Sequence, residues 1–144
     1  MVIRKKAKVS LILIVLLTSL ASFGSCSQKK QLTENDFRTL KAGMTTSKVK
    51  KEIGKPQKVI EDELLVKKIM DEDSNSSIDR WSSENPDLFN EFYGKKKEYY
   101  YDILDRMEDI ICYEYDYTYD ASSSDIEKWH VYFYRDKVVW MSFP

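Results

Sequence analysis

The hydrophobic pattern of the chain changes near residue 110, from the spacing of helices to the alternation of strands. Before that point apolar residues recur three or four positions apart, as they do in 98–107, which is the period of an amphipathic helix. After it, apolar and polar residues alternate in 111–119, and strand-like runs follow in 128–134 and 137–143. The pattern predicts helices followed by a three-stranded sheet, which is an α+β fold.

The clearest helix signal lies between Met44 and Gly54. Thr45 is placed to cap this helix, while Met44 and Val49 have the spacing of a hydrophobic staple. Val49 and Ile53 then share one helical face. Gly54 can take the left-handed conformation that ends helices, and a proline two positions later prevents the helix from continuing. We therefore predict a helix that ends at Gly54 with a positive φ angle.

The remaining elements are predicted from local patterns and breaker residues. In chain order they are a short helix at 34–40, a strand or turn that passes into a helix at 59–70, a Ser- and Asp-rich surface loop at 71–83, and helices at 86–93 and 98–107. Residues 61–108 would then form a largely helical insertion before the sheet. The turn at Arg135-Asp136 is short enough to join the last two strands as an antiparallel hairpin.

The amino-terminal residues have the order of a bacterial lipoprotein signal. Basic residues at 4–8 precede an uncharged, mostly apolar stretch at 9–23, which is too short for a comfortable permanent span. Two small residues then lead into Cys26, whose thiol is the group to which a diacylglyceryl lipid would be attached. Acyl chains such as palmitate at this position would anchor the protein to a membrane surface.

This order predicts the domain organisation. Residues 1–25 are expected to be a signal peptide, 26–33 a flexible tether that begins at an acylated Cys26, and 34–144 a single domain. An ordinary secretory signal, cleaved at another small residue such as Ala21, is the alternative.

The charge of the chain argues against a nucleic-acid partner, and its cysteine content argues against an internal disulfide. The full chain has 23 basic and 24 acidic residues. Four of the basic residues and none of the acidic ones lie in the predicted signal peptide, so the remaining domain is acidic. It lacks the clustered basic residues of a nucleic-acid-binding protein, and the run at 95–97 is expected to be solvated. With Cys26 acylated, Cys112 is the remaining cysteine, so no internal disulfide is predicted.

The sequence predicts no catalytic, metal or cofactor site. His130 is the only histidine, no Gly-x-Ser-x-Gly motif is present, and the acidic run 71–73 lacks the spacing of a calcium loop. His130 is expected at a half-exposed position in a strand. A hydrolase that uses Cys112 and His130 on neighbouring strands is the alternative, and it would lose its geometry if these residues lay on opposite faces of the sheet.

Aromatic residues are the candidates for a partner interface. Tyr113, Tyr115 and Tyr117 fall on one face of the first predicted strand. Their rings either cover the helix layer, with the hydroxyls at the rim, or form an exposed face that binds another protein. Trp81, within the predicted loop, is a candidate interface anchor, and simple packing is its alternative.

The segment from Gly43 to Pro56 resembles the helix motif of the SmpA/OmlA family of small outer-membrane lipoproteins, which includes BamE of the β-barrel assembly machinery. The matching positions are Gly43, Met44, Thr45, Val49, Ile53, Gly54 and Pro56. The predicted closing hairpin and the lipoprotein-like start are also similar. The resemblance implies a two-layer fold, in which helices pack on a three-stranded antiparallel sheet. The insertion at 61–108 replaces what is a short link in that family.

We expect from these features a lipid-anchored, non-catalytic binding or scaffold module of the cell envelope. The resemblance implies a role in outer-membrane assembly or envelope maintenance. Its partners would be the membrane, through Cys26, and another envelope protein. Ser27 is not the Asp that commonly signals inner-membrane retention, so the expected location is the outer membrane, facing the periplasm, in a cell that has one. The same helix motif also occurs in modules that inhibit secreted enzymes, which makes an inhibitor-like domain the alternative.

Overall fold

The computed structural model describes residues 30–84, 86–93, 97–106 and 108–142. The chain divides into a unit of residues 1–30 and a unit of residues 31–144, and the fold described below is that of the second unit. Its elements are β1 (Leu32–Thr33), α2 (Glu34–Phe37), α3 (Thr46–Ile53), β2 (Lys58–Ile60), α4 (Glu63–Glu84), α5 (Pro86–Tyr93), α6 (Lys97–Arg106), β3 (Ile110–Thr118), β4 (Glu127–Tyr134) and β5 (Lys137–Met141). The predicted signal peptide and Cys26 lie outside the described residues.

The domain is α+β, as predicted, but its sheet has five strands rather than three. β3, β4 and β5 form the expected antiparallel series, in which Tyr115 lies opposite Trp129. β2 adds to the other side of β3 in antiparallel orientation, and β1 adds there in parallel orientation. Leu32 and Thr33, assigned to the tether from sequence, therefore belong to the sheet. The prediction missed β1 because two residues are too few to show an alternating pattern. For β2 it left a strand or a turn open at the start of 59–70, and the structure has a strand there.

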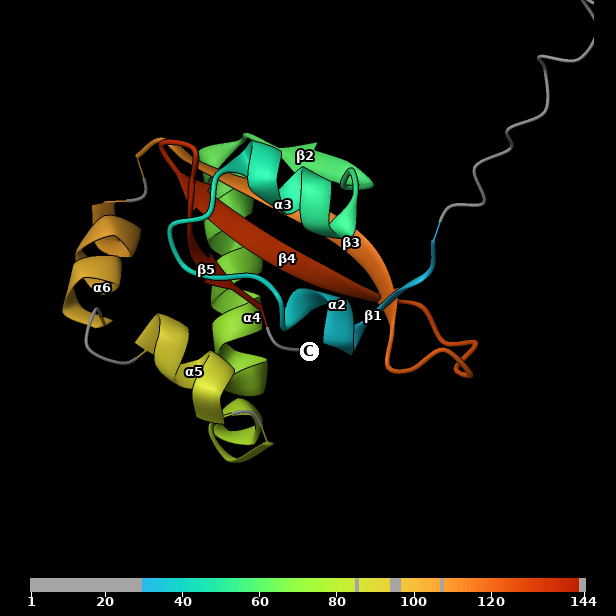
Figure 1. The fold of residues 1–144 in the computed structure, drawn as a ribbon. Helices are drawn as coiled ribbons and strands as arrows, with labels where there is room; N and C mark the ends of the chain where they lie inside the picture. The colour runs from blue at the N-terminus through green and yellow to red at the C-terminus, as the bar shows by residue number, and fades with distance from the viewer. Residues whose placement is uncertain (1–29, 85, 94–96, 107, 143–144) are drawn as a thin grey trace, which may run out of the picture. The chain divides into compact units, whose positions relative to one another are not determined.

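One face of the sheet is covered by α2 and α3 (Figure 1). Phe37 of α2 is fully buried and stacks on Trp129, with 4.3 Å between the ring centroids. It also meets Tyr115 and Tyr117 edge-on, at 5.7 and 6.0 Å. Edge-to-face and offset contacts of this kind are favourable for aromatic rings. The aromatic face of β3 is therefore the core beneath the first two helices.

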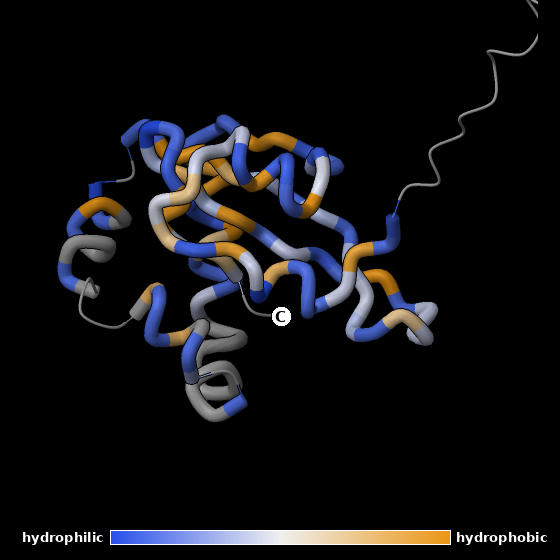
Figure 2. The backbone as a smooth tube through the Cα atoms, viewed as in Figure 1, coloured by the Kyte–Doolittle hydropathy of each residue, from blue (hydrophilic) through white to orange (hydrophobic). Residues whose placement is uncertain are grey.

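Helix α3 has the cap and the face that the sequence predicts. The Thr45 hydroxyl accepts a hydrogen bond from the backbone N–H of Lys48 at 3.2 Å, and Val49 and Ile53 are buried. Figure 2 shows the matching change between hydrophilic and hydrophobic positions along this helix. The helix ends at Gly54, whose φ angle of +89° confirms the prediction.

We expect Gly54→Val to lower the free energy of unfolding by about 1–2 kcal/mol, because a β-branched residue is strained at this φ angle. A Cβ at this position would have no heavy atom within 4 Å, so the loss would come from the backbone rather than from a steric clash. Urea unfolding measures it, with Lys51→Val on the exposed side of α3 as the control. Equal unfolding midpoints for the two variants would contradict this account of how α3 ends.

The opposite face of the sheet is covered by α4, which corrects two predictions (Figure 1). Residues 71–83 are helical and not a surface loop. Val66 and Met70 of α4 are buried, and the helix contacts the side of the sheet that faces away from α2 and α3. The domain therefore has helices on both faces of the sheet, whereas the predicted arrangement had two layers. The Ser- and Asp-rich composition of 71–83 concealed the helix, because the buried apolar residues Val66 and Met70 lie before this segment.

Helices α5 and α6 complete the insertion and begin within one residue of their predicted positions. Phe92 of α5 and Ile103 of α6 are buried and belong to the same hydrophobic core as the strands. The insertion at 61–108 is thus helical, as predicted, and it extends the core rather than standing apart from it.

Candidate functional site

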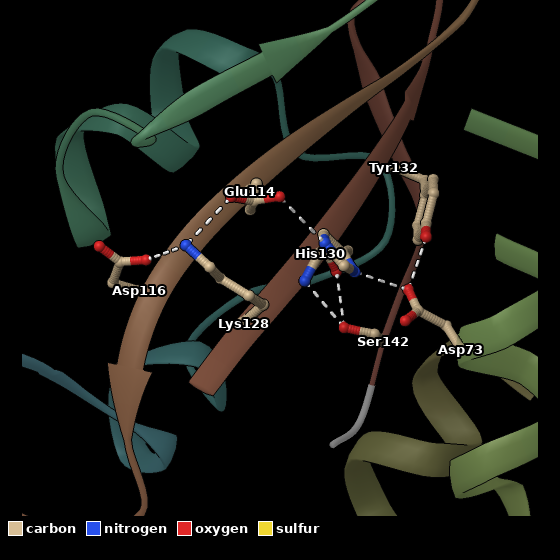
Figure 3. Close-up of polar contacts among 7 residues, drawn as sticks. All are labelled: Asp73, Glu114, Asp116, Lys128, His130, Tyr132 and Ser142. Carbon is tan, nitrogen blue, oxygen red and sulfur yellow. Dashed lines mark hydrogen bonds and ion pairs between the residues drawn. The ribbon is translucent and has the colours of Figure 1, made fainter. Parts of the chain in front are cut away.

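A cluster of polar side chains lies on the sheet face that α4 covers (Figure 3). We call it the polar cluster; its members are Asp73, Glu114, Asp116, Lys128, His130, Tyr132 and Ser142. Alternation along β3 directs Glu114 and Asp116 to this face, and the antiparallel register places His130 and Lys128 directly opposite them. Because residues opposite each other in an antiparallel pair lie close together, the register brings these charges into contact.

Asp73 connects helix α4 to the sheet. The Tyr132 hydroxyl donates a hydrogen bond of 2.6 Å to Asp73 Oδ2, and His130 Nδ1 lies 2.9 Å from the same oxygen. The Asp73 side chain is 16% exposed and that of His130 is 11% exposed. Hydrogen bonds to a charged acceptor are stronger than neutral ones, above all where water is largely excluded. Asp73 therefore holds the middle of α4 against β4.

The polar contacts continue from His130 to Lys128, near the beginning of β4. His130 Nε2 lies 3.7 Å from Glu114 Oε2, and Lys128 Nζ lies 3.2 Å from Glu114 Oε1 and 2.5 Å from Asp116 Oδ1. The hydrogen bonds to Asp116 and then to Glu114 raise the pKa of the Lys128 ammonium group. Lys128 therefore bridges the two carboxylates of β3, and the His130 ring lies between Glu114 and Asp73.

His130 is also fixed through its backbone. Its N–H donates to the Ser142 hydroxyl at 2.8 Å, and its carbonyl accepts from the Ser142 N–H at 2.8 Å. The residue as a whole is 9% exposed, which corrects the prediction of a half-exposed position. The prediction failed because α4, assigned as a loop, covers this part of β4.

Cys112 lies on the same sheet face as His130, diagonally across the β3–β4 pair. The two residues therefore do not lie on opposite faces of the sheet, which is the arrangement that would have excluded the hydrolase. The thiol is nevertheless poorly suited to attack a substrate, because burial raises its pKa and the negative charges of Asp73 and Glu114 raise it further. The thiolate is the nucleophilic form of cysteine, so Cys112 stays a protonated, buried thiol at neutral pH.

The three tyrosines considered for a partner interface are part of the core. Tyr113, Tyr115 and Tyr117 are all buried. The Tyr115 hydroxyl donates to the Gly54 carbonyl at 3.3 Å and the Tyr117 hydroxyl to Glu127 at 2.7 Å. Burial raises the pKa of Tyr115. The contacts agree with the interpretation in which the rings cover the helix layer, and these tyrosines offer no exposed aromatic face for a partner.

Trp81 lies in the last part of α4 and not in a loop. Its side chain lies outside the described residues, so its predicted role as an interface anchor stays a prediction.

Sequence reasoning selected His130 but not the other six members of the cluster, which are Asp73, Glu114, Asp116, Lys128, Tyr132 and Ser142. Glu114 was placed on the correct face of its strand, but its neighbours depend on the register between β3 and β4. A signal for Asp73 was present, because Val66, Met70 and Asp73 follow one another at helical intervals of four and three residues. That spacing continues one face of α4 into the segment assigned as a loop.

Within the described ranges, no group of three or more His, Cys, Asp or Glu side chains is arranged to hold a metal ion. Among the helices that the structure describes, none combines the length and the hydropathy needed to cross a bilayer. Comparisons of the chain with protein-family models, with curated proteins and with solved structures find no match.

Proposed function

We propose that this protein is a lipid-anchored binding module of the cell envelope that acts through contact with another envelope protein, without catalysis. The anchor would be an acylated Cys26, preceded by a cleaved signal peptide. We further propose a distant relationship to the SmpA/OmlA family, in which α3 and the β3–β5 sheet form the shared part. β1, β2 and the helices α4–α6 would be additions of this chain.

The observation that carries the binding proposal is an exposed apolar surface where β2 passes into α4. Leu64 is 82% exposed, and Val59 and Leu65 in the same segment are also exposed. The Asp62 carboxylate accepts a hydrogen bond of 2.8 Å from the Leu65 N–H, so the start of α4 is capped and the leucines are carried on a formed helix. Apolar residues held outward on a rigid element are suited to a protein partner.

The contacts of the polar cluster support a structural rather than a catalytic role for His130 and Cys112. His130 lies between Asp73 and Glu114, and Cys112 is kept in the thiol form by burial and by those same carboxylates. An activated cysteine needs a nearby positive charge that lowers the thiol pKa. The cluster supplies the opposite environment.

Cys26→Ser tests the anchor. We expect the variant to remain an unacylated precursor and to leave the membrane fraction, because it lacks the thiol that receives the lipid. Labelling of cells with a radioactive fatty acid, followed by fractionation, measures both effects, and Ser27→Ala is the matched control. Incorporation of label into the Cys26→Ser protein would contradict the proposed attachment site.

Crosslinking in intact cells, followed by capture of the full-length protein, tests the binding surface. We expect Leu64→Ser and Trp81→Ala to weaken capture of the partner without unfolding the domain, because truncation of an interface anchor costs about 2 kcal/mol, roughly thirtyfold in affinity. Lys51→Ala on the exposed side of α3 is the control. Unchanged capture by Leu64→Ser would exclude the β2–α4 surface, and unchanged capture by Trp81→Ala would exclude Trp81 as an anchor.

The same experiment distinguishes the alternatives. The Cys112→Ser, His130→Gln double variant should keep its captured partner and its envelope phenotype. Loss of the phenotype with an intact fold and intact capture would favour the hydrolase. If the captured protein is a secreted enzyme whose activity falls on binding, the module is an inhibitor.

A further inference from the structure

The β3–β4 loop, residues 119–126, carries exposed apolar side chains at both of its ends. Tyr119 is 59% exposed and Ile126 is 68% exposed. Single exposed apolar residues are common on protein surfaces. The position of this loop and its fixed shape are what distinguish it.

Hydrogen bonds within the loop hold its shape. The Asp120 carboxylate accepts from the backbone N–H groups of Ser122 and Ser123 at 2.7 and 3.0 Å, and from the Ser122 hydroxyl at 2.6 Å. These bonds, led by the one from the Ser122 side chain, lower the pKa of Asp120. A turn closed in this way keeps the residues at its two ends in position.

The loop adjoins the beginning of the folded domain. Thr33 of β1 lies opposite Thr118, the last residue of β3. The Thr118 hydroxyl accepts from the Gln31 side chain at 3.2 Å and donates to the Asp120 carbonyl at 2.9 Å. Thr118 therefore contacts both β1 and the start of the loop. Figure 1 shows the loop projecting from the end of the sheet where β1 lies, and Figure 2 shows hydrophobic positions in both segments.

The length of chain before β1 limits how far the loop can be from an anchor. Cys26 and Gln31 are separated by five peptide units, which span at most about 18 Å when fully extended. If Cys26 is acylated, this end of the sheet stays near the lipid surface at a high effective concentration. Tyrosine and isoleucine are suited to such an interface, where a ring or an aliphatic group can leave water.

We infer that the β3–β4 loop rests on the lipid surface to which the chain is anchored, with Tyr119 and Ile126 in contact with it. This inference depends on the proposed acylation of Cys26. Asp120 and Asp125 in the loop favour a surface of net-neutral phospholipids over an anionic one, because like charges repel at short range. The contact would orient the domain, with the β2–α4 segment left free for a protein partner.

Fluorescence quenching by lipid tests the inference on the full-length acylated protein, reconstituted in vesicles of phosphatidylcholine and phosphatidylethanolamine. A fluorophore is attached after Ala121→Cys in the loop or, as the matched control, after Glu108→Cys at the opposite end of β3. Acylated Cys26 has no free thiol, and Cys112 is buried. We expect nitroxide-labelled lipid to quench the probe at position 121 and not the probe at 108.

Three altered proteins identify the cause of the quenching. Tyr119→Ser with Ile126→Ser should shift the ratio of docked to undocked loop by about tenfold, whereas Leu64→Ser should leave quenching at 121 unchanged. A flexible insertion of about twenty residues after Ser27 should also reduce the quenching, because a longer tether lowers the effective concentration of the surface.

Flotation of the vesicles separates failure of the inference from failure of the anchor. Protein that floats but shows equal quenching at 108 and 121, or none at 121, would overturn the loop contact and leave the lipid anchor intact. Shielding of the probe at 121 without quenching by lipid would assign the loop to a contact with a second copy of the protein and contradict the inference. Protein that does not float would overturn both proposals.

Discussion

Phe37→Ala should lower the free energy of unfolding by about 3–5 kcal/mol, the range for truncation of a buried aromatic ring. Phe37 is fully buried, stacked on Trp129 and edge-on to Tyr115 and Tyr117. Its removal leaves a cavity under α2. It also removes aromatic contacts, which contribute more stabilisation than the burial of their surface area alone. A loss of that order is a large fraction of the free energy of unfolding of a typical domain, which is about 5–15 kcal/mol.

Chemical denaturation followed by tryptophan fluorescence measures this loss. Phe37→Leu keeps part of the volume and should cost about 1–2 kcal/mol, while Leu64→Ala at an exposed position should stay within about 0.5 kcal/mol of the wild type. If the Phe37→Ala and Leu64→Ala proteins unfolded at the same denaturant concentration, the packing of α2 on the aromatic face of β3 would be wrong.

Asp73→Ala should lower the free energy of unfolding by about 2–3 kcal/mol, because it leaves the Tyr132 hydroxyl and His130 Nδ1 without their shared acceptor in a largely buried place. Asp73→Asn retains an acceptor oxygen and should cost less. Hydrogen exchange gives a second readout, since α4 should lose protection before the β3–β5 strands do.

A double-mutant cycle with Tyr132→Phe isolates the contact. Asp73 and Tyr132 share a hydrogen bond of 2.6 Å, so their effects should couple by about 1 kcal/mol or more. Asp102→Ala is the control: its ion pair with Arg106 is exposed, and the expected change is within about 0.5 kcal/mol. Additive effects of Asp73→Ala and Tyr132→Phe would show that α4 is not held at this point.

The amino-acid sequence by itself determined the elements that are defined locally. The α3 helix from Thr46 to Ile53 was predictable because its cap, its buried face and its terminating glycine lie within one short segment. The strands β3 to β5 were predictable because an alternating pattern reports burial of one side of a strand. The aromatic face of β3 was assigned in the same way, although only its burial under Phe37 decided between core and interface.

The tertiary structure alone decided the features that depend on long-range pairing. β1 is too short to show a pattern, and the sequence left β2 open between a strand and a turn; both are strands because β3 offers an edge with which they pair. The middle of α4 contacts β4 through Asp73, whose partners lie more than fifty positions away. The polar cluster follows from the register of β3 with β4 and from the helix above it. Helical spacing indicates that Asp73 shares a face with Val66 and Met70, but neither the strand register nor the partners of Asp73 can be found from local spacing, because a contact across strands and layers depends on the packing of the whole chain.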